Sequence, residues 1–196
     1  MKDLVKYGVS FTRDENGDFV YTREGAHAHH RILFHEDITG KEITSHLLNA
    51  VKKLKNVRMY EYTTLLDILC DGSKCCGGII RWPDGREEQV EADYVILATG
   101  GIGGTYKHST NFKHLTGDGV EIARRHNIEL KNLDYVQIHP TTLYSDNKEE
   151  RSFLISESVR GEGAKLYNNS KERFTEELLP RDILTGNIRK EMKREG

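Results

Sequence analysis

The most constraining feature of the sequence is an apolar run that ends in glycines, within residues 92–104. Residues 94–98 are mainly apolar and show no alternation of polar positions, which is typical of a strand buried on both faces of a layered α/β sheet. Thr99, Gly100 and Gly101 follow directly. Glycines at such a point either turn the chain or let a ligand approach the backbone amides closely. The run therefore predicts an α/β fold with a candidate ligand-binding turn.

Length and charge narrow the classes of function. The chain has 196 residues and a formal net charge of -2, so it offers no positive field for nucleic acid or an anionic membrane. No apolar run reaches the ~20 residues of a membrane helix, and the first residues do not resemble an export signal. We therefore expect a cytoplasmic protein with no nucleic-acid or membrane partner. Its three cysteines are expected to be reduced thiols.

Turn residues and hydrophobic periodicity predict a mixture of helices and strands. An amphipathic helix is expected to begin at Thr39, because apolar residues recur at a spacing of three to four. Further helices are expected after Asp118 and after Pro180. The expected β elements are a hairpin at 8–21, a meander at 57–62, 64–70, 77–82 and 87–92, and strands at 130–138 and 153–155.

Several polar residues admit both a structural and a functional interpretation. His27, His29 and His30 fall within four positions, but no carboxylate or thiol at suitable spacing completes a ligand set. We therefore expect no metal site, and interpret this segment as a cationic loop beside an anionic ligand. Asp118 is expected to cap a helix or to meet a ligand hydroxyl. His139, before a proline at a predicted strand end, is either structural or a binding group.

Several motifs, taken together and in order, resemble one family of flavoproteins. The family includes L-aspartate oxidase and the flavoprotein subunits of succinate dehydrogenase and fumarate reductase. Within it, Thr142-Leu143-Tyr144 after His-Pro-Thr and the form of residues 153–157 are most similar to the aspartate oxidase branch. The motifs that carry the resemblance are Ala98-Thr99-Gly100-Gly101, Thr116-Gly117-Asp118-Gly119, Gln137-Ile138-His139-Pro140-Thr141, Ser156-Glu157 with Arg160-Gly161-Glu162-Gly163, and Pro180-Arg181-Asp182.

The resemblance implies a fold and a domain division. Residues 1–132 would be the central part of a flavin-binding, doubly wound domain of the glutathione-reductase type with a β-meander. Residues 133–196 would begin an α+β capping domain that closes over the substrate. The Gly-x-Gly-x-x-Gly segment that holds the flavin pyrophosphate in the family is missing from this sequence. We therefore interpret the chain as a central fragment, which we expect to be inactive and colourless on its own.

The resemblance also implies a reaction and its residues. L-aspartate would be oxidised to iminoaspartate by hydride transfer to FAD, the first step towards quinolinate and NAD, with oxygen or fumarate as electron acceptor and quinolinate synthase as an implied partner. Arg181 matches the family's proton donor or acceptor, although a guanidinium hardly loses its proton and is better suited to an electrostatic clamp. The other implied residues are His139, Ser156 and Glu157 for substrate, with Glu157 orienting the amine or a neighbouring arginine, and Ala98, Thr99, Gly100, Gly101, Asp118, Thr63 and Thr64 for FAD.

Two alternatives remain open from the sequence. The first is a fumarate reductase or succinate dehydrogenase flavoprotein, which would act on fumarate or succinate. The second is a non-catalytic piece of a larger assembly, or a binding module, and the missing dinucleotide motif favours it for these 196 residues.

Overall fold

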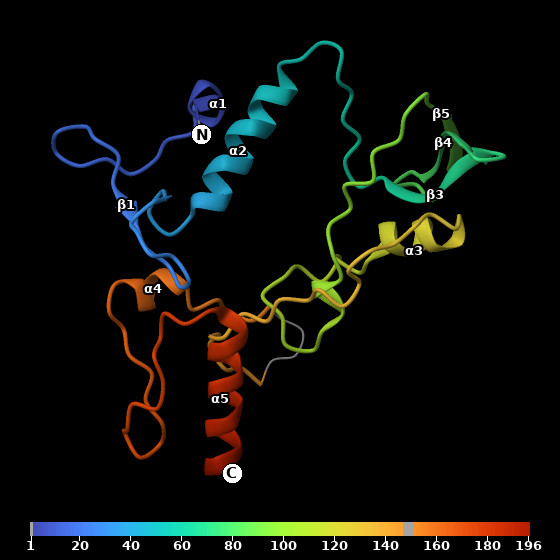
Figure 1. Ribbon diagram of the computed structural model, residues 1–196. Helices are drawn as coiled ribbons and strands as arrows, with labels where there is room; N and C mark the ends of the chain where they lie inside the picture. Colours follow the sequence, from blue (N-terminus) through green and yellow to red (C-terminus); the bar gives the residue numbers. More distant parts are fainter. Residues whose placement is uncertain (1, 147–150) are drawn as a thin grey trace. The chain divides into compact units, whose positions relative to one another are not determined.

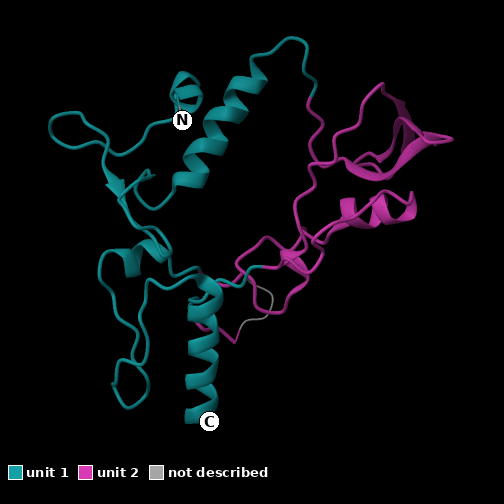
Figure 2. Cartoon of the chain, in the orientation of Figure 1, with its two compact units in different colours: residues 1–58, 137–143, 154–196 teal, residues 59–136, 144–153 magenta. Residues whose placement is uncertain are grey.

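The computed structural model describes residues 2–146 and 151–196 (Figure 1). The chain forms two compact units, each built from segments that are distant in the sequence (Figure 2). Unit 1 comprises residues 1–58, 137–143 and 154–196, and unit 2 comprises residues 59–136 and 144–153. The boundaries of these units differ from the expected domain boundary at residue 132. The expected division into domains stays a prediction.

The regular secondary structure of unit 1 is mainly helical. Its helices are α1 (Lys2–Lys6), α2 (Thr39–Lys52), α4 (Glu157–Gly161) and α5 (Arg181–Glu195). Two short strands, β1 (Tyr21–Thr22) and β2 (Ile32–Leu33), pair antiparallel. The most deeply buried apolar side chain, Leu184, lies in the first turn of α5 and is fully inaccessible. Burial of this leucine fixes the start of α5, and with it the position of Arg181.

In unit 1 the predicted amphipathic helix is confirmed, whereas the predicted hairpin is reduced to its turn and one isolated bridge. The amphipathic helix begins at Thr39, where the sequence places it. The turn forms around Gly17, whose N–H donates to the carbonyl of Asp14 at 3.0 Å, while Arg13 pairs with Phe19. Gly17 has a φ of +86°, a conformation that glycine adopts without strain.

Unit 2 contains a three-stranded antiparallel meander. Its strands β3 (Thr64–Asp71), β4 (Lys74–Arg81) and β5 (Glu87–Glu91) lie in the order of the sequence. A short 3-10 helix, η1 (Gly103–Thr105), precedes α3 (Asp118–Arg125). The end of α3 is tied to β3, because Arg125 donates to the carbonyl of Leu66 and His126 Nε2 lies 2.8 Å from Asp67 Oδ1. The predicted strands at 64–70, 77–82 and 87–92 are thus confirmed within the meander.

Other predicted strands are wrong, and most conspicuously the apolar run at 94–98. These residues form no strand, and the side chains of Tyr94 and Ile96 are 90% and 88% exposed. A strand needs a neighbour for its N–H and C=O groups. Within the part of the chain that the structure describes, the sheets contain only β1–β2 and β3–β4–β5, so this run has no pairing partner.

Local backbone geometry explains two further wrong strands. Tyr62, the last residue of the segment 57–62, has a φ of +56°, and Asn132 interrupts the segment 130–138 with the same φ. L residues rarely adopt this left-handed conformation, and it cannot continue a strand. The expected strand at 153–155 is reduced to a single bridge between Leu154 and Thr142. The fold is therefore a mixture of helices and antiparallel sheets, and within the described residues no helix is long and apolar enough to cross a membrane.

Candidate active site

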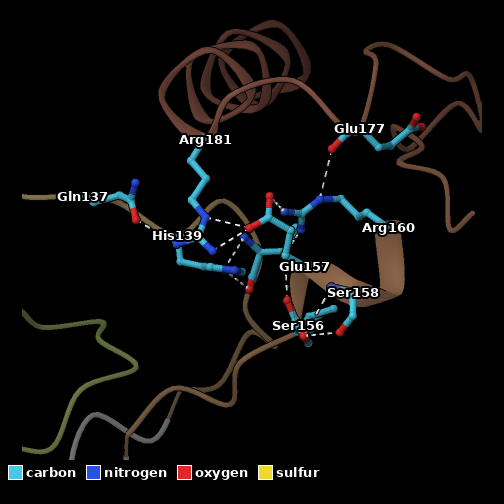
Figure 3. A network of polar contacts seen from close by, with 10 residues as sticks. Gln137, His139, Ser156, Glu157, Ser158, Arg160, Glu177 and Arg181 are labelled. Carbon is cyan, nitrogen blue, oxygen red and sulfur yellow. Dashed lines mark hydrogen bonds and ion pairs between the residues drawn. The ribbon is translucent and has the colours of Figure 1, made fainter. Parts of the chain in front are cut away.

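An ion pair between Glu157 and Arg181 forms the centre of the candidate site in unit 1 (Figure 3). Each residue is the first of its helix, Glu157 in α4 and Arg181 in α5. Arg181 Nε donates to Glu157 Oε2 at 2.7 Å, and Arg181 Nη1 donates to Gln137 Oε1 at 2.7 Å. Pro180 immediately precedes α5 and has a φ of −48°, which is suited to a helix start. The guanidinium of Arg181 is thus held on two sides by segments far apart in the sequence.

A second guanidinium, that of Arg160, lies on the other side of Glu157. Arg160 is in the same helix as Glu157, and its Nη2 lies 3.7 Å from Glu157 Oε1. Its Nη1 donates to Thr141 Oγ1 at 2.6 Å, and its Nε donates to the carbonyl of Glu177 at 3.2 Å. The side chain is buried, and Nη2 makes no hydrogen bond within the described residues. Burial, together with the charge of Arg181, lowers the pKa of Arg160, although an arginine remains charged at physiological pH.

His139 lies beside this cluster as a neutral side chain. Its Nδ1 is 3.0 Å from the carbonyl oxygen of Thr141 and 3.3 Å from the amide nitrogen of the same residue. Burial lowers the pKa of His139, and the positive charges of Arg181 and Arg160 lower it further, against the backbone contact with Thr141. The imidazole therefore carries no charge at neutral pH, and it offers hydrogen bonds rather than a cation.

The hydroxyl of Ser156 is used by the helix that follows it. Ser156 is the N-cap of α4, and its Oγ accepts from the Ser158 amide at 3.3 Å and lies 2.6 Å from Ser158 Oγ. Such a cap satisfies an amide that the helix leaves unpaired. Ser156 thereby fixes the start of α4 and the position of Glu157.

The glycine-containing loop at 23–33 approaches the site through its backbone. A Cβ at Gly25 would collide with Glu157 Oε1, so glycine is required for this close approach. The next amide, that of Ala26, donates to the carbonyl of Leu178 at 3.1 Å. The loop expected beside an anionic ligand therefore lies against the carboxylate of Glu157. Across residues 2–146 and 151–196, no group of three histidines, cysteines or acidic residues is arranged to hold a metal ion.

The residues predicted to hold FAD lie in unit 2, where two glycine-containing turns interlock. A Cβ at Gly119 would collide with Thr99 Oγ1, and a Cβ at Gly100 would lie 2.8 Å from Leu115 Cδ2. Gly100 also has a φ of +76°. Thr99 and Gly100 are exposed and lie against the start of α3, where unpaired helix amides favour an anionic group. This exposed backbone with little room for side chains fits the close approach of FAD.

The remaining predicted flavin residues are less tightly grouped. Asp118 does not cap α3, since the N-cap is Gly117, with a φ of +82° and no side chain to offer. Asp118 Oδ1 accepts instead from Thr116 Oγ1 at 2.7 Å, which fixes its carboxylate beside the glycine turns. Thr63 and Thr64 lie at the start of the meander, where Thr63 Oγ1 donates to the carbonyl of Glu61.

The structure thus brings some predicted residues together within each unit. His139, Ser156, Glu157 and Arg181 belong to unit 1, whereas Ala98, Thr99, Gly100, Gly101, Asp118, Thr63 and Thr64 belong to unit 2. A slot shared by both sets stays a prediction.

Several residues that contact Glu157 or its partners had no site role predicted from the sequence. Arg160 lies three positions after Glu157, a spacing that places side chains on one helix face, and this signal could have found it. Gln137 is part of a recognised motif. Thr141 belongs to the same motif, and Gly25 lies in the loop expected beside an anionic ligand. Glu177 carries no local signal, because only the folded chain brings it to the site.

Comparisons with known proteins agree with these features. A family model described as "FAD binding domain" matches residues 1–196. The chain is 50% identical to an L-aspartate oxidase of Clostridium perfringens, over 97% of this chain and 43% of the relative. It is 44% identical to an L-aspartate oxidase of Clostridium acetobutylicum, over 98% of this chain and 44% of the relative. The chain therefore spans less than half the length of these relatives.

Solved structures agree as well. The chain resembles that of an E. coli quinol fumarate reductase with a TM-score of 0.90 and 26% identity, covering 99% of this chain and 36% of the other.

Proposed function

Because this chain belongs to the FAD binding domain family, we propose that it supplies flavin-binding and substrate-binding groups to an enzyme that oxidises L-aspartate to iminoaspartate. The observation that carries the proposal is the cluster of a buried Glu157, a buried Arg160 and a partly exposed Arg181 beside a neutral His139. Relatives named L-aspartate oxidase at 50% and 44% identity support the choice of substrate.

The charges of the cluster suit an anionic substrate. Arg181 and Arg160 contribute two positive charges, and Glu157 contributes one negative charge, so the cluster keeps one positive charge in excess. Interactions between charges are stronger in a buried site than in water. A carboxylate of L-aspartate would compensate the excess charge, and the neutral imidazole of His139 would add a hydrogen bond without further charge.

Arg181 acts in this proposal as a fixed positive group. Its guanidinium keeps its proton, and the bonds to Glu157 and Gln137 prevent it from turning away. A preorganised charge of this kind stabilises charge that develops in a transition state without reorganisation. The proton-transfer role that the family resemblance implies for Arg181 would use the same position.

For FAD, the turn at residues 98–101 and the carboxylate of Asp118 are the proposed holding groups, with Thr63 and Thr64 near the adenine. When bound, FAD would supply the acceptor for the hydride that leaves the substrate Cα. The interlocked glycines let backbone amides approach the cofactor closely, and they leave no room for a side chain between Thr99 and α3.

Replacement of Arg181 tests the proposal. In the whole FAD-bound protein, Arg181→Leu should lower aspartate turnover by about a hundredfold or more, because one preorganised charge is worth ~3 kcal/mol, while bound FAD still absorbs near ~450 nm. The matched control is Arg189→Leu, an exposed arginine of the same helix, which should keep normal turnover. Normal turnover in Arg181→Leu would contradict the assignment.

A second candidate function is that of a fumarate reductase or succinate dehydrogenase flavoprotein, and the TM-score of 0.90 to a quinol fumarate reductase favours it. Comparison of L-aspartate with succinate as electron donor separates the two. If succinate reduces the bound FAD and L-aspartate does not, the aspartate proposal is wrong and the second function is supported. A chain that binds no flavin even within the whole protein would indicate a non-catalytic module instead.

The proposal includes the finer points of organisation. Residues 1–132 would belong to a doubly wound flavin domain and residues 133–196 to the start of a capping domain. Oxygen or fumarate would accept the electrons, quinolinate synthase would use the product, and the protein would work in the cytoplasm.

A further inference from the structure

A pair of cysteines faces each other across the β3–β4 hairpin of unit 2. Cys70 in β3 and Cys75 in β4 are direct partners in the antiparallel register. The next pair outward is Asp71 with Lys74, which leaves Gly72 and Ser73 as a two-residue turn. Gly72 has a φ of +59°, as tight hairpin turns require. The two thiols therefore lie one register step from a well-defined turn.

The register gives this pair a spacing that a disulfide can bridge. In a four-residue turn the carbonyl of the first residue usually bonds the amide of the last, which makes Asp71 and Lys74 a hydrogen-bonded pair. Such pairs alternate with non-hydrogen-bonded pairs, so Cys70 and Cys75 occupy the latter kind, with Cα atoms ~4.5 Å apart and side chains close. Disulfides span Cα separations of ~4.4–6.8 Å, so no backbone movement is required.

The third cysteine, Cys76, has a different environment. Leu69 pairs with Gly77 while Cys70 pairs with Cys75, so Cys76 is the additional residue of a β-bulge. Its Sγ lies 3.4 Å from the carbonyl oxygen of Leu69. No residue of β3 is the register partner of Cys76, which therefore serves as an internal control for the pair.

Small oxidants can reach the pair from solvent. Cys70 is exposed, and a cavity of about 620 Å³ opens beside it, lined by residues that include Cys76, Lys74, Glu91 and Asp93. Desolvation raises the pKa of the Cys70 thiol, and the neighbouring thiols of Cys75 and Cys76 raise it further. Because the thiolate is the reactive form, oxidation is expected to accelerate as the pH rises.

We propose that Cys70 and Cys75 form a peroxide-sensitive dithiol site that closes to a cross-strand disulfide. The sulfur of one thiolate attacks one oxygen of hydrogen peroxide, and a sulfenic acid forms. The O–O bond breaks, and its electron pair leaves with the other oxygen as hydroxide. The second thiol displaces water from the sulfenic acid, and the S–S bond forms. The balance is two thiols and one peroxide to one disulfide and two waters, and a small thiol reductant reverses it.

This chemistry does not rest on the proposed function. Peroxide is, however, the two-electron reduction product of oxygen, one of the acceptors proposed above, so the site would lie within a protein that generates its oxidant.

Peptide mapping tests the pairing, because trypsin cuts after Lys74 and separates the two cysteines. The whole protein is treated with hydrogen peroxide, its remaining thiols are blocked, and it is digested without reductant. We expect residues 59–74 to be linked to residues 75–81, with loss of two of the three thiols and full recovery by dithiothreitol. Cys76→Ser should keep the link, whereas Cys75→Ser and Cys70→Ser should lose it.

Several results would overturn the proposal. These are a link that persists in Cys75→Ser, a bond between Cys75 and Cys76 inside one peptide, links between separate chains only, and retention of all three thiols. A sample oxidised in urea shows whether the fold directs the pairing. There the preference for Cys75 over Cys76 should disappear, and an unchanged preference would mean that the hairpin register plays no part.

Discussion

The carboxylate of Glu177 is expected to contribute strongly to the stability of unit 1. Its side chain is 2% exposed, and it accepts hydrogen bonds from Arg173 Nε at 3.0 Å, Arg173 Nη2 at 2.7 Å and the Leu166 amide at 3.1 Å. Its own carbonyl oxygen holds Arg160 Nε at 3.2 Å. The residue thus links a partly exposed ion pair to the candidate active site.

The size of the stabilisation by Glu177 follows from the shift in the pKa of its carboxyl group. Hydrogen bonds from Arg173, against the opposing effect of burial, lower the pKa of Glu177 from 4.5 to about 2. At ~1.4 kcal/mol per pKa unit this corresponds to ~3 kcal/mol of stability. Arg173 is 37% exposed, and screening by water reduces the expected loss in Glu177→Gln to ~2 kcal/mol.

The neighbouring residue supplies a matched control. Glu176 contacts the same arginine at 2.8 Å but is 73% exposed, so Glu176→Gln should cost at most ~0.5 kcal/mol. Urea unfolding followed by circular dichroism at pH 7 gives the free energy of unfolding for both variants and the parent protein.

The pH dependence provides the refuting measurement. Because the folded pKa is lowered, the stabilisation by Glu177 is complete above pH ~4.5 and is lost as the pH falls towards 2. The difference between the parent protein and Glu177→Gln should therefore shrink across this range. A difference that is independent of pH, or equal losses in both variants, would refute the assigned role of the buried carboxylate.

Two glycines in helices should respond oppositely to replacement by alanine, and the stabilisation by one partly buried contact should depend on pH. Gly186→Ala in α5 should raise the free energy of unfolding by ~1 kcal/mol, because no atom lies within 4 Å of the new Cβ and alanine favours the helix. Gly119→Ala in α3 should lower it by ~1–3 kcal/mol and reduce FAD content, because the Cβ collides with Thr99. Asp67→Asn should lower the free energy of unfolding by ~1 kcal/mol at pH 7, because it changes the contact with His126. Against the opposing effect of desolvation, that contact and the nearby charges hold the pKa of Asp67 below its ordinary value. The loss in Asp67→Asn should therefore fade as the pH falls below ~3.8.

Elements with a strong local signal could be predicted from the sequence. The apolar spacing after Thr39 gives α2, and the turns at Gly72 and Gly85 give the meander. Pro180 marks the start of α5. These signals succeed because a helix or a tight turn closes its hydrogen bonds between residues a few positions apart.

Strands that depend on distant partners could not be predicted in this way. The run at 94–98 has the composition of a buried strand, yet Tyr94 and Ile96 are exposed. Apolar composition records only that a segment can be buried, whereas pairing requires a second strand in register.

For the candidate site, the motifs could be recognised in the sequence, and they led to the likeness to flavoproteins and to the choice of Arg181, Glu157 and His139. Only the fold brings the carbonyl of Glu177 to Arg160 and Thr141 beside Glu157, and only the fold packs Gly25 against the carboxylate of Glu157. The physical reason is that a buried charge must be compensated by whichever groups the fold brings within hydrogen-bond distance. Glu177 comes from a segment that is far from Glu157 along the chain, so no local pattern marks it.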